Sequence, residues 1–169
     1  ELAKNFRNEG MDSNHNPEYT SLEYYQAYSD MFDMMDLTEN LIQYVALETG
    51  EVKFKYNANK IDLTIPFQKQ SMFSLLGEYA QEDLSEMDGK ELVKFAKSKS
   101  LDVGKDMNYG KVLDKIFGEI VEPNLIDPIF VTDYPKAISP LAKEDRDGNP
   151  NIVERFELFI SGMEFANSF

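Results

Sequence analysis

The 169-residue sequence contains no cysteine and no tryptophan, and it has a single histidine. Without cysteine, disulfides and thiolate-bound metal sites are excluded. No apolar run approaches the ~20 residues that cross a bilayer. Basic residues are also scarce, because 17 Lys and Arg stand against 31 Asp and Glu, which gives a net charge of -14. This charge argues against a broad nucleic-acid-binding surface, but it leaves room for a nucleotide pocket that uses a few cations and Mg²⁺.

The hydrophobic pattern predicts strands near both ends of the chain and helices in between. A capped, amphipathic helix is predicted from about residue 30 to 46, followed by an alternating hairpin over 51–64. Three short helices with apolar faces follow. The first is predicted to begin at about Pro66, the second after Asp88 or Gly89, and the third to run from Asn108 to Val121. Strand patterns return within 123–169. This order predicts a single α+β domain with helices packed on the edge of a sheet.

The N-terminal stretch combines charged and aromatic residues in an unusual way. It has a strand pattern over 3–9, a Gly-, Asn- and Pro-rich loop, and an aromatic strand pattern over 19–28. Residues two apart on a strand share a face. One face of this hairpin is therefore predicted to carry Arg7, Glu9, Tyr19, Glu23 and Tyr25, with His15 in the loop.

This set of side chains suits a small ligand that carries charges of both signs. Arg7 can donate two hydrogen bonds to a phosphate or carboxylate, and Tyr19 offers a ring on which a base can stack. Glu23 and Tyr25 can hold an ammonium group. The same pattern also fits a hairpin whose polar face simply meets water, which is the commoner situation.

Two glutamates near the C-terminus form a second candidate site. A tight turn near Ser161-Gly162 would place Glu157 and Glu164 on one face of a hairpin, opposite or diagonal to each other. Like charges in such positions destabilise a hairpin. A bound Mg²⁺ would reverse that effect, because it takes one or two carboxylates together with substrate phosphates. The spacing is equally compatible with two solvated carboxylates.

The order of these residues resembles motif 2 of the class II lysyl-tRNA synthetases. The segments that carry this resemblance are FRNEG at 6–10 and HNPEYTSLEYYQAY at 15–28. Three further segments resemble the stretch between motifs 2 and 3 of the same enzymes: PNLIDPIFVTDYP at 123–135, ISPLAK at 138–143 and ERFELFISGMEFANSF at 154–169. The resemblance covers essentially the whole chain.

The resemblance implies the antiparallel sheet of the class II aminoacyl-tRNA synthetase catalytic domain, interrupted by a helical insertion. The chain would be a partial catalytic domain, 1–169. Residues 1–64 would hold the motif 2 hairpin, the helix and the next hairpin, 65–122 the helical insertion, and 123–169 the remaining active-site strands. Compared with the family pattern, the chain lacks motif 1, motif 3 and the anticodon-binding barrel, so we expect a fragment of a longer protein.

The resemblance also assigns roles around ATP. Arg7 would be the catalytic arginine that grips the α-phosphate and the amino-acid carboxylate. Glu9 and His15 would contact ATP, and Asn16 would order the loop. Tyr19 stands where the family usually has Phe, and its ring would stack on adenine equally well. One phosphate contact differs, because many bacterial members carry Arg where this chain has Asn14.

Further roles follow for the amino acid and the metal. Glu23 and Tyr25 match the pair that reads the ε-ammonium of lysine, and Asn167 matches an asparagine near the amino acid. Glu157 and Glu164 match the metal-binding glutamates, which makes Mg²⁺ the expected cofactor. The resemblance thus implies binding sites for ATP and L-lysine.

The activity implied for the parent protein is that of a lysine-tRNA ligase. It would activate L-lysine with ATP to lysyl-adenylate and transfer lysine to tRNA(Lys), as a cytoplasmic homodimer without membrane contact. One alternative is the paralogue that attaches a lysine-type group to elongation factor P, although it lacks the helical insertion and the SPLAK form. Aspartyl and asparaginyl enzymes lack the Glu23 and Tyr25 arrangement. Another alternative is a non-catalytic folding fragment with exposed strand edges and no activity alone.

Overall fold

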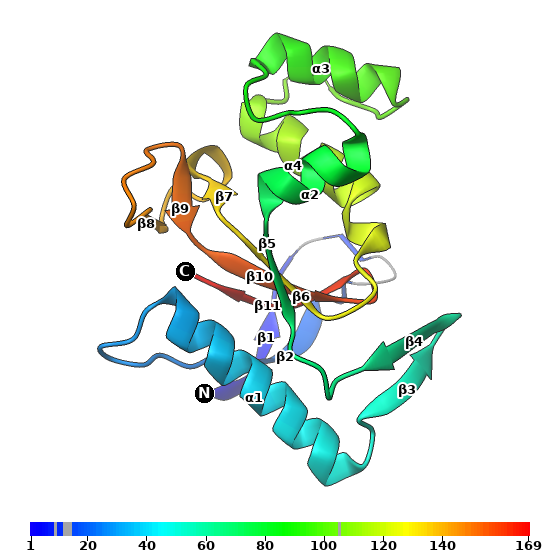
Figure 1. The fold of residues 1–169 in the computed structure, drawn as a ribbon, viewed down its shortest axis with the longest axis vertical. Helices are drawn as coiled ribbons and strands as arrows, with labels where there is room; N and C mark the ends of the chain where they lie inside the picture. The colour runs from blue at the N-terminus through cyan, green and yellow to red at the C-terminus, as the bar shows by residue number, and fades with distance from the viewer. Residues whose placement is uncertain (9, 12–14, 105) are drawn as a thin grey trace. The chain divides into compact units, whose positions relative to one another are not determined.

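The computed structural model describes residues 1–8, 10–11, 15–104 and 106–169. The chain divides into two compact units, Glu1–Asp30 and Met31–Phe169, which are drawn in Figure 1. Taken together, the two units contain helices and mainly antiparallel strand pairs, so the α+β class is confirmed. Within the described residues, no helix is long and apolar enough to cross a membrane.

The Glu1–Asp30 unit is built on one antiparallel strand pair. Strand β1 (Leu2–Phe6) pairs with β2 (Glu18–Leu22). The pairing continues for one residue at each end, since Arg7 N donates to Pro17 O and Glu23 N donates to Glu1 O, each at 2.8 Å. The predicted strand over 19–28 is therefore too long. In the structure this strand ends at Leu22.

The Met31–Phe169 unit contains the remaining elements. They are α1 (Met31–Thr49), β3 (Lys53–Tyr56), β4 (Asn59–Asp62), β5 (Gln68–Ser71), α2 (Met72–Ala80), α3 (Gly89–Ser98), α4 (Tyr109–Ile120), η1 (Glu122–Asn124), β6 (Ile129–Thr132), β7 (Tyr134–Pro135), η2 (Lys136–Ile138), β8 (Lys143–Glu144), β9 (Ile152–Glu154), β10 (Phe156–Ile160) and β11 (Met163–Ser168). The predicted hairpin over 51–64 is confirmed as β3 and β4. Helix α1 continues about one turn beyond its predicted end, to Thr49, and is followed by Gly50, which has a φ of +77°.

A four-stranded sheet in the order β11-β10-β6-β5 forms the centre of this unit. Strand β5 runs parallel to β6, whereas the other pairs are antiparallel. The prediction of a helix beginning at about Pro66 is wrong, because Gln68–Ser71 pairs with the buried strand Ile129–Thr132 before α2 begins. Parallel neighbours need a long crossover. Helices α2, α3 and α4 provide it.

The sheet is covered on both faces (Figure 1). Adjacent residues of β6 point to opposite sides, so Val131 joins the core formed with α2–α4, and Phe130 joins the core formed with α1. Aromatic rings contact each other in both cores. Phe130 of β6 lies 5.2 Å from Phe156 of β10 between ring centroids, on the α1 side, and Phe117 of α4 lies 6.0 Å from Phe159 of β10 on the other side. The sheet strands that carry the candidate site are thus held between two layers.

Side-chain caps explain where two of the crossover helices begin. Asp88 accepts hydrogen bonds from Lys90 N and Glu91 N, while the Glu91 carboxylate accepts one from Asp88 N. Asn108 accepts a bond from Lys111 N at 3.0 Å. The predicted starts of α3 and α4 are confirmed.

Candidate active site

A bulge in the β10–β11 hairpin brings the candidate residues onto one face. The turn residues Ser161 and Gly162 both have positive φ, as a two-residue hairpin turn of this twist requires. From the turn, Phe159 pairs with Glu164, but the register then shifts and Glu157 pairs with Asn167. A regular hairpin would place Ala166 opposite Glu157. The extra residue therefore brings Asn167 to the face that carries Glu157 and Glu164.

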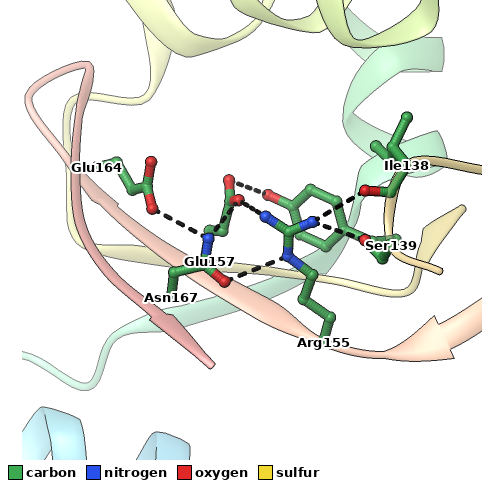
Figure 2. A network of polar contacts seen from close by, with 7 residues as sticks. Ile138, Ser139, Arg155, Glu157, Glu164 and Asn167 are labelled. Carbon is green, nitrogen blue, oxygen red and sulfur yellow. Dashed lines mark hydrogen bonds and ion pairs between the residues drawn. The ribbon is translucent and has the colours of Figure 1, made fainter. Parts of the chain in front are cut away.

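Arg155 lies at the centre of the polar network on this face (Figure 2). Its guanidinium group forms an ion pair with Glu157, and its Nε donates to Asn167 Oδ1 at 3.2 Å. Its Nη1 donates to Ser139 Oγ at 2.6 Å and to the Ile138 carbonyl at 3.4 Å. Arg155 therefore joins β10 and β11 to the last residue of η2 and to the residue that follows it.

The Asn167 amide joins the two glutamates (Figure 2). Its Nδ2 donates to Glu157 Oε1 at 3.0 Å and to Glu164 Oε1 at 3.2 Å. The other oxygen of Glu157 accepts a hydrogen bond of 2.7 Å from the Tyr134 hydroxyl. The Glu157 side chain is only 12% exposed, whereas Glu164 is exposed. The site thus has one buried and one accessible carboxylate.

Negative charge accumulates around this network. Burial and the nearby Glu164 charge raise the pKa of Glu157, against the opposing effects of Tyr134 and Arg155. Burial also raises the pKa of Glu122 to about 7, with further contributions from Glu157, Asp114 and Glu164. A cation at this face would relieve the repulsion.

The Glu1–Asp30 unit carries a separate group of expected residues. The Arg7 guanidinium lies 5.6 Å from the centroid of the Tyr19 ring. The Tyr25 hydroxyl donates to the Glu23 carboxylate at 2.5 Å, and this bond raises the pKa of Tyr25. The prediction that Glu23 and Tyr25 continue the strand face of Tyr19 is wrong, because both lie beyond the end of β2.

The loop residues of this unit are described only in part. Asn16 Oδ1 accepts a hydrogen bond from Glu18 N at 3.3 Å, which braces the start of β2. His15 is exposed. Glu9 and Asn14 lie outside the described residues.

The sequence profile of the class II tRNA synthetases (D, K and N) matches residues 1–169. The chain belongs to this family. Lysine-tRNA ligases are among its relatives. The chain is 45% identical over 170 residues to the one from Christiangramia forsetii, and 47% identical over 171 residues to the one from Thermoanaerobacter sp. strain X514. These alignments cover 100% of this chain but 30% and 34% of the two relatives, so the chain spans about a third of their length.

A third lysine-tRNA ligase is also similar to this class II synthetase chain over its whole length. The lysine-tRNA ligase of Porphyromonas gingivalis is 41% identical over 170 residues, which is 100% of this chain and 29% of that protein.

The donor set of this synthetase chain fits a hard cation that is shared with a substrate. In the described part of the chain, no group of three or more Asp, Glu, His or Cys side chains is arranged to hold a metal ion. Mg²⁺ commonly needs only one or two carboxylates, with substrate phosphates completing its shell. Glu157 Oε1 already accepts two hydrogen bonds, but Oε2 accepts one and has a second lone pair. Glu164 and this oxygen are suitable ligands.

Sequence reasoning did not identify Arg155 or Tyr134. The spacing held one signal for Arg155, since it precedes Glu157 by two residues and strand residues two apart share a face. Tyr134 reaches Glu157 through the pairing of distant segments, for which the sequence has no local pattern.

Proposed function

We propose that this chain is the central part of the catalytic domain of a lysine-tRNA ligase. The parent protein activates L-lysine with ATP to lysyl-adenylate and transfers lysine to tRNA(Lys). The observation that carries this proposal is the identity of 41% to 47% with lysine-tRNA ligases across the whole chain. The proposed parts of this catalytic domain are residues 1–64, a helical insertion over 65–122, and residues 123–169. We also propose that the parent protein is a cytoplasmic homodimer.

Activation of lysine requires no side-chain nucleophile. A carboxylate oxygen of lysine attacks the α-phosphorus of ATP, the new oxygen-phosphorus bond forms, and pyrophosphate leaves. Arg7 holds the α-phosphate and offsets the charge that develops there, so catalysis comes from positioning and electrostatic stabilisation. Tyr19 stacks on adenine, with Glu9, His15 and Asn16 as further ATP-binding residues.

Lysine recognition is assigned to the end of the Glu1–Asp30 unit. The Glu23 carboxylate binds the ε-ammonium, and the Tyr25 hydroxyl, which donates to Glu23, holds that carboxylate in place. An amino acid without the ammonium group would leave Glu23 unpaired, which is how polar sites reject a substrate. Asn167 is proposed as a further residue near the amino-acid substrate.

Glu157 and Glu164 are the residues that would hold Mg²⁺. When bound, the ion supplies positive charge to the phosphates of ATP. The raised pKa of Glu157, due to burial and to Glu164, supports a cation-binding role for this face.

A chimera tests this function in a complete enzyme. Residues 1–169 replace the segment of the Thermoanaerobacter ligase that aligns with them. ATP-pyrophosphate exchange is then measured with lysine, aspartate and asparagine. We expect exchange with lysine alone. Glu23→Gln should raise the KM for lysine about 10- to 100-fold through loss of a charged hydrogen bond. Glu119→Gln, on the surface of α4, is the matched control and should leave the KM unchanged.

The outcomes separate the alternatives. A folded chimera without lysine-dependent exchange would overturn the proposal, as would exchange with aspartate or asparagine. Transfer to elongation factor P in place of tRNA would assign the chain to the paralogue. The isolated 169-residue chain is expected to show little or no aminoacylation, and its binding of a non-hydrolysable lysyl-adenylate analogue, with and without Mg²⁺, can be measured by calorimetry.

A further inference from the structure

We propose that Arg155 is a positioning residue of this site, which fixes the direction of the Asn167 amide and the place of the Glu157 carboxylate. The inference rests on the proposed function, because Asn167 and Glu157 are the groups assigned there to the amino acid and the metal. Arg155 itself acts through these two residues.

The first argument comes from hydrogen-bond chemistry. A guanidinium group only donates hydrogen bonds. Its Nε is 3.2 Å from the Asn167 side chain, so Asn167 must present its oxygen to Arg155. The Asn167 nitrogen then faces the other way, where it donates to Glu157 and Glu164. The reversed amide would place its N–H groups against Arg155 and its oxygen against two carboxylates. Arg155 therefore selects one orientation of Asn167.

The second argument is that Arg155 is itself held from several directions. Ser139 Oγ and the Ile138 carbonyl accept hydrogen bonds from its Nη1, as Figure 2 shows. The guanidinium carbon lies 4.7 Å from the centroid of the Tyr134 ring. The Arg155 side chain is only 17% exposed. Such an anchored group can transmit a fixed geometry to Asn167 and Glu157, which a mobile surface arginine cannot do.

The third argument concerns the shape of the side chain. The planar guanidinium group donates in several fixed directions, whereas a lysine ammonium is a compact point charge on a flexible stem. Arg155→Lys therefore keeps the positive charge beside Glu157 but cannot reach Ser139, Glu157 and Asn167 together. This substitution separates the positioning role from simple charge neutralisation.

The chain contains a matched control. Arg146 also pairs with a buried glutamate, since its Nε donates to Glu154 at 2.5 Å. It also lies over an aromatic ring, 5.0 Å from the centroid of Phe32. Arg146→Lys makes the same chemical change in a similar arrangement, and neither of these two contacts involves Asn167.

The first measurement uses the 169-residue chain and needs neither metal nor substrate. In ¹⁵N-labelled protein, the side-chain amide signals of Asn167 are assigned by their loss in Asn167→Asp. We expect these signals to shift and to merge with those of solvent-exposed amides in Arg155→Lys. They should stay in place in Arg146→Lys. Ser139→Ala, which removes one anchor of Arg155, should move them in the same direction by a smaller amount.

The second measurement uses the chimeric ligase. Arg155→Lys should raise the KM for lysine about tenfold, the effect of losing one well-placed hydrogen bond. The kcat should change by a smaller factor, because the affected groups already hold the substrate before reaction. Arg146→Lys should leave both constants unchanged.

Either of two results would overturn the inference. The first is an unchanged Asn167 signal in a folded Arg155→Lys chain. The second is a change in KM that Arg146→Lys reproduces, since the effect would then be general loss of stability. If Arg155→Lys does not fold, Ser139→Ala decides in its place. If the parent chimera lacks lysine-dependent exchange, the proposed function fails, while the Asn167 signals still decide the role of Arg155.

Discussion

Glu122 should make the stability of this chain depend on pH in a defined direction. Its folded-state pKa of about 7 lies above the ordinary value of 4.5, mainly because of burial and then because of Glu157 and other carboxylates. Below pH 4.5 the group is protonated in both the folded and the unfolded state and costs nothing. As pH rises from 4.5 to 7, the unfolded chain ionises more readily, so the free energy of unfolding falls. Above pH 7 the full cost is present.

The magnitude follows from the size of this pKa change. A rise from 4.5 to about 7 corresponds to roughly 3 kcal/mol in the limit of a fully buried group. Glu122 is only half-buried, so solvent screening reduces this cost to about 1–2 kcal/mol. Glu122→Gln removes the ionisation. The variant should therefore be more stable than the parent chain by about 1–2 kcal/mol at pH 8, with the difference vanishing near pH 4.5.

Urea unfolding followed by circular dichroism at several pH values between 4.5 and 8 measures this difference. Glu119→Gln on the exposed side of α4, where Glu119 pairs with Lys115, controls for the loss of one negative charge. A gain in Glu122→Gln that is constant across this pH range would refute the reasoning. So would an equal pH-dependent gain in Glu119→Gln.

Three further substitutions test the packing and the caps, each by urea unfolding. Gly110→Ala places a Cβ 2.6 Å from Ile138 Cγ2 and close to adjacent backbone, so we expect a loss of about 1–3 kcal/mol; a neutral effect would show that α4 and η2 can separate. Phe130→Ala should cost about 3–5 kcal/mol, because its fully buried ring joins α1 to the sheet. Asn108→Ala removes the cap on Lys111 N and should cost about 1 kcal/mol, less than either packing change.

Local patterns predicted the elements whose residues interact with near neighbours in sequence. The starts of α3 and α4 follow from Asp88 and Asn108, which cap the backbone two or three residues on. The hairpin of β3 and β4 follows from alternation around a short turn. The family also follows from linear order, since the segments at 6–10 and 154–169 that suggested it fall within the matched region.

Elements that depend on distant partners were predicted poorly. Strand β5 has the polar sequence Gln-Lys-Gln-Ser, and only its pairing with β6, about 60 residues away, makes it a strand. The helix predicted from about Pro66 therefore began too early, because α2 begins only at Met72. The predicted strand over 19–28 was also too long, since the pairing of β2 with β1 ends at Leu22.

The candidate site, too, was predicted from the sequence only in part. The sequence by itself determined the residue types, the alternation that places Glu157 and Glu164 on one face, and the family to which the chain belongs. Only the tertiary structure decided that a bulge turns Asn167 onto that face and that Arg155 and Tyr134 hold Glu157 there. The physical reason is that a register shift and a hydrogen-bond network depend on which segments meet in space, and local propensity carries no record of that.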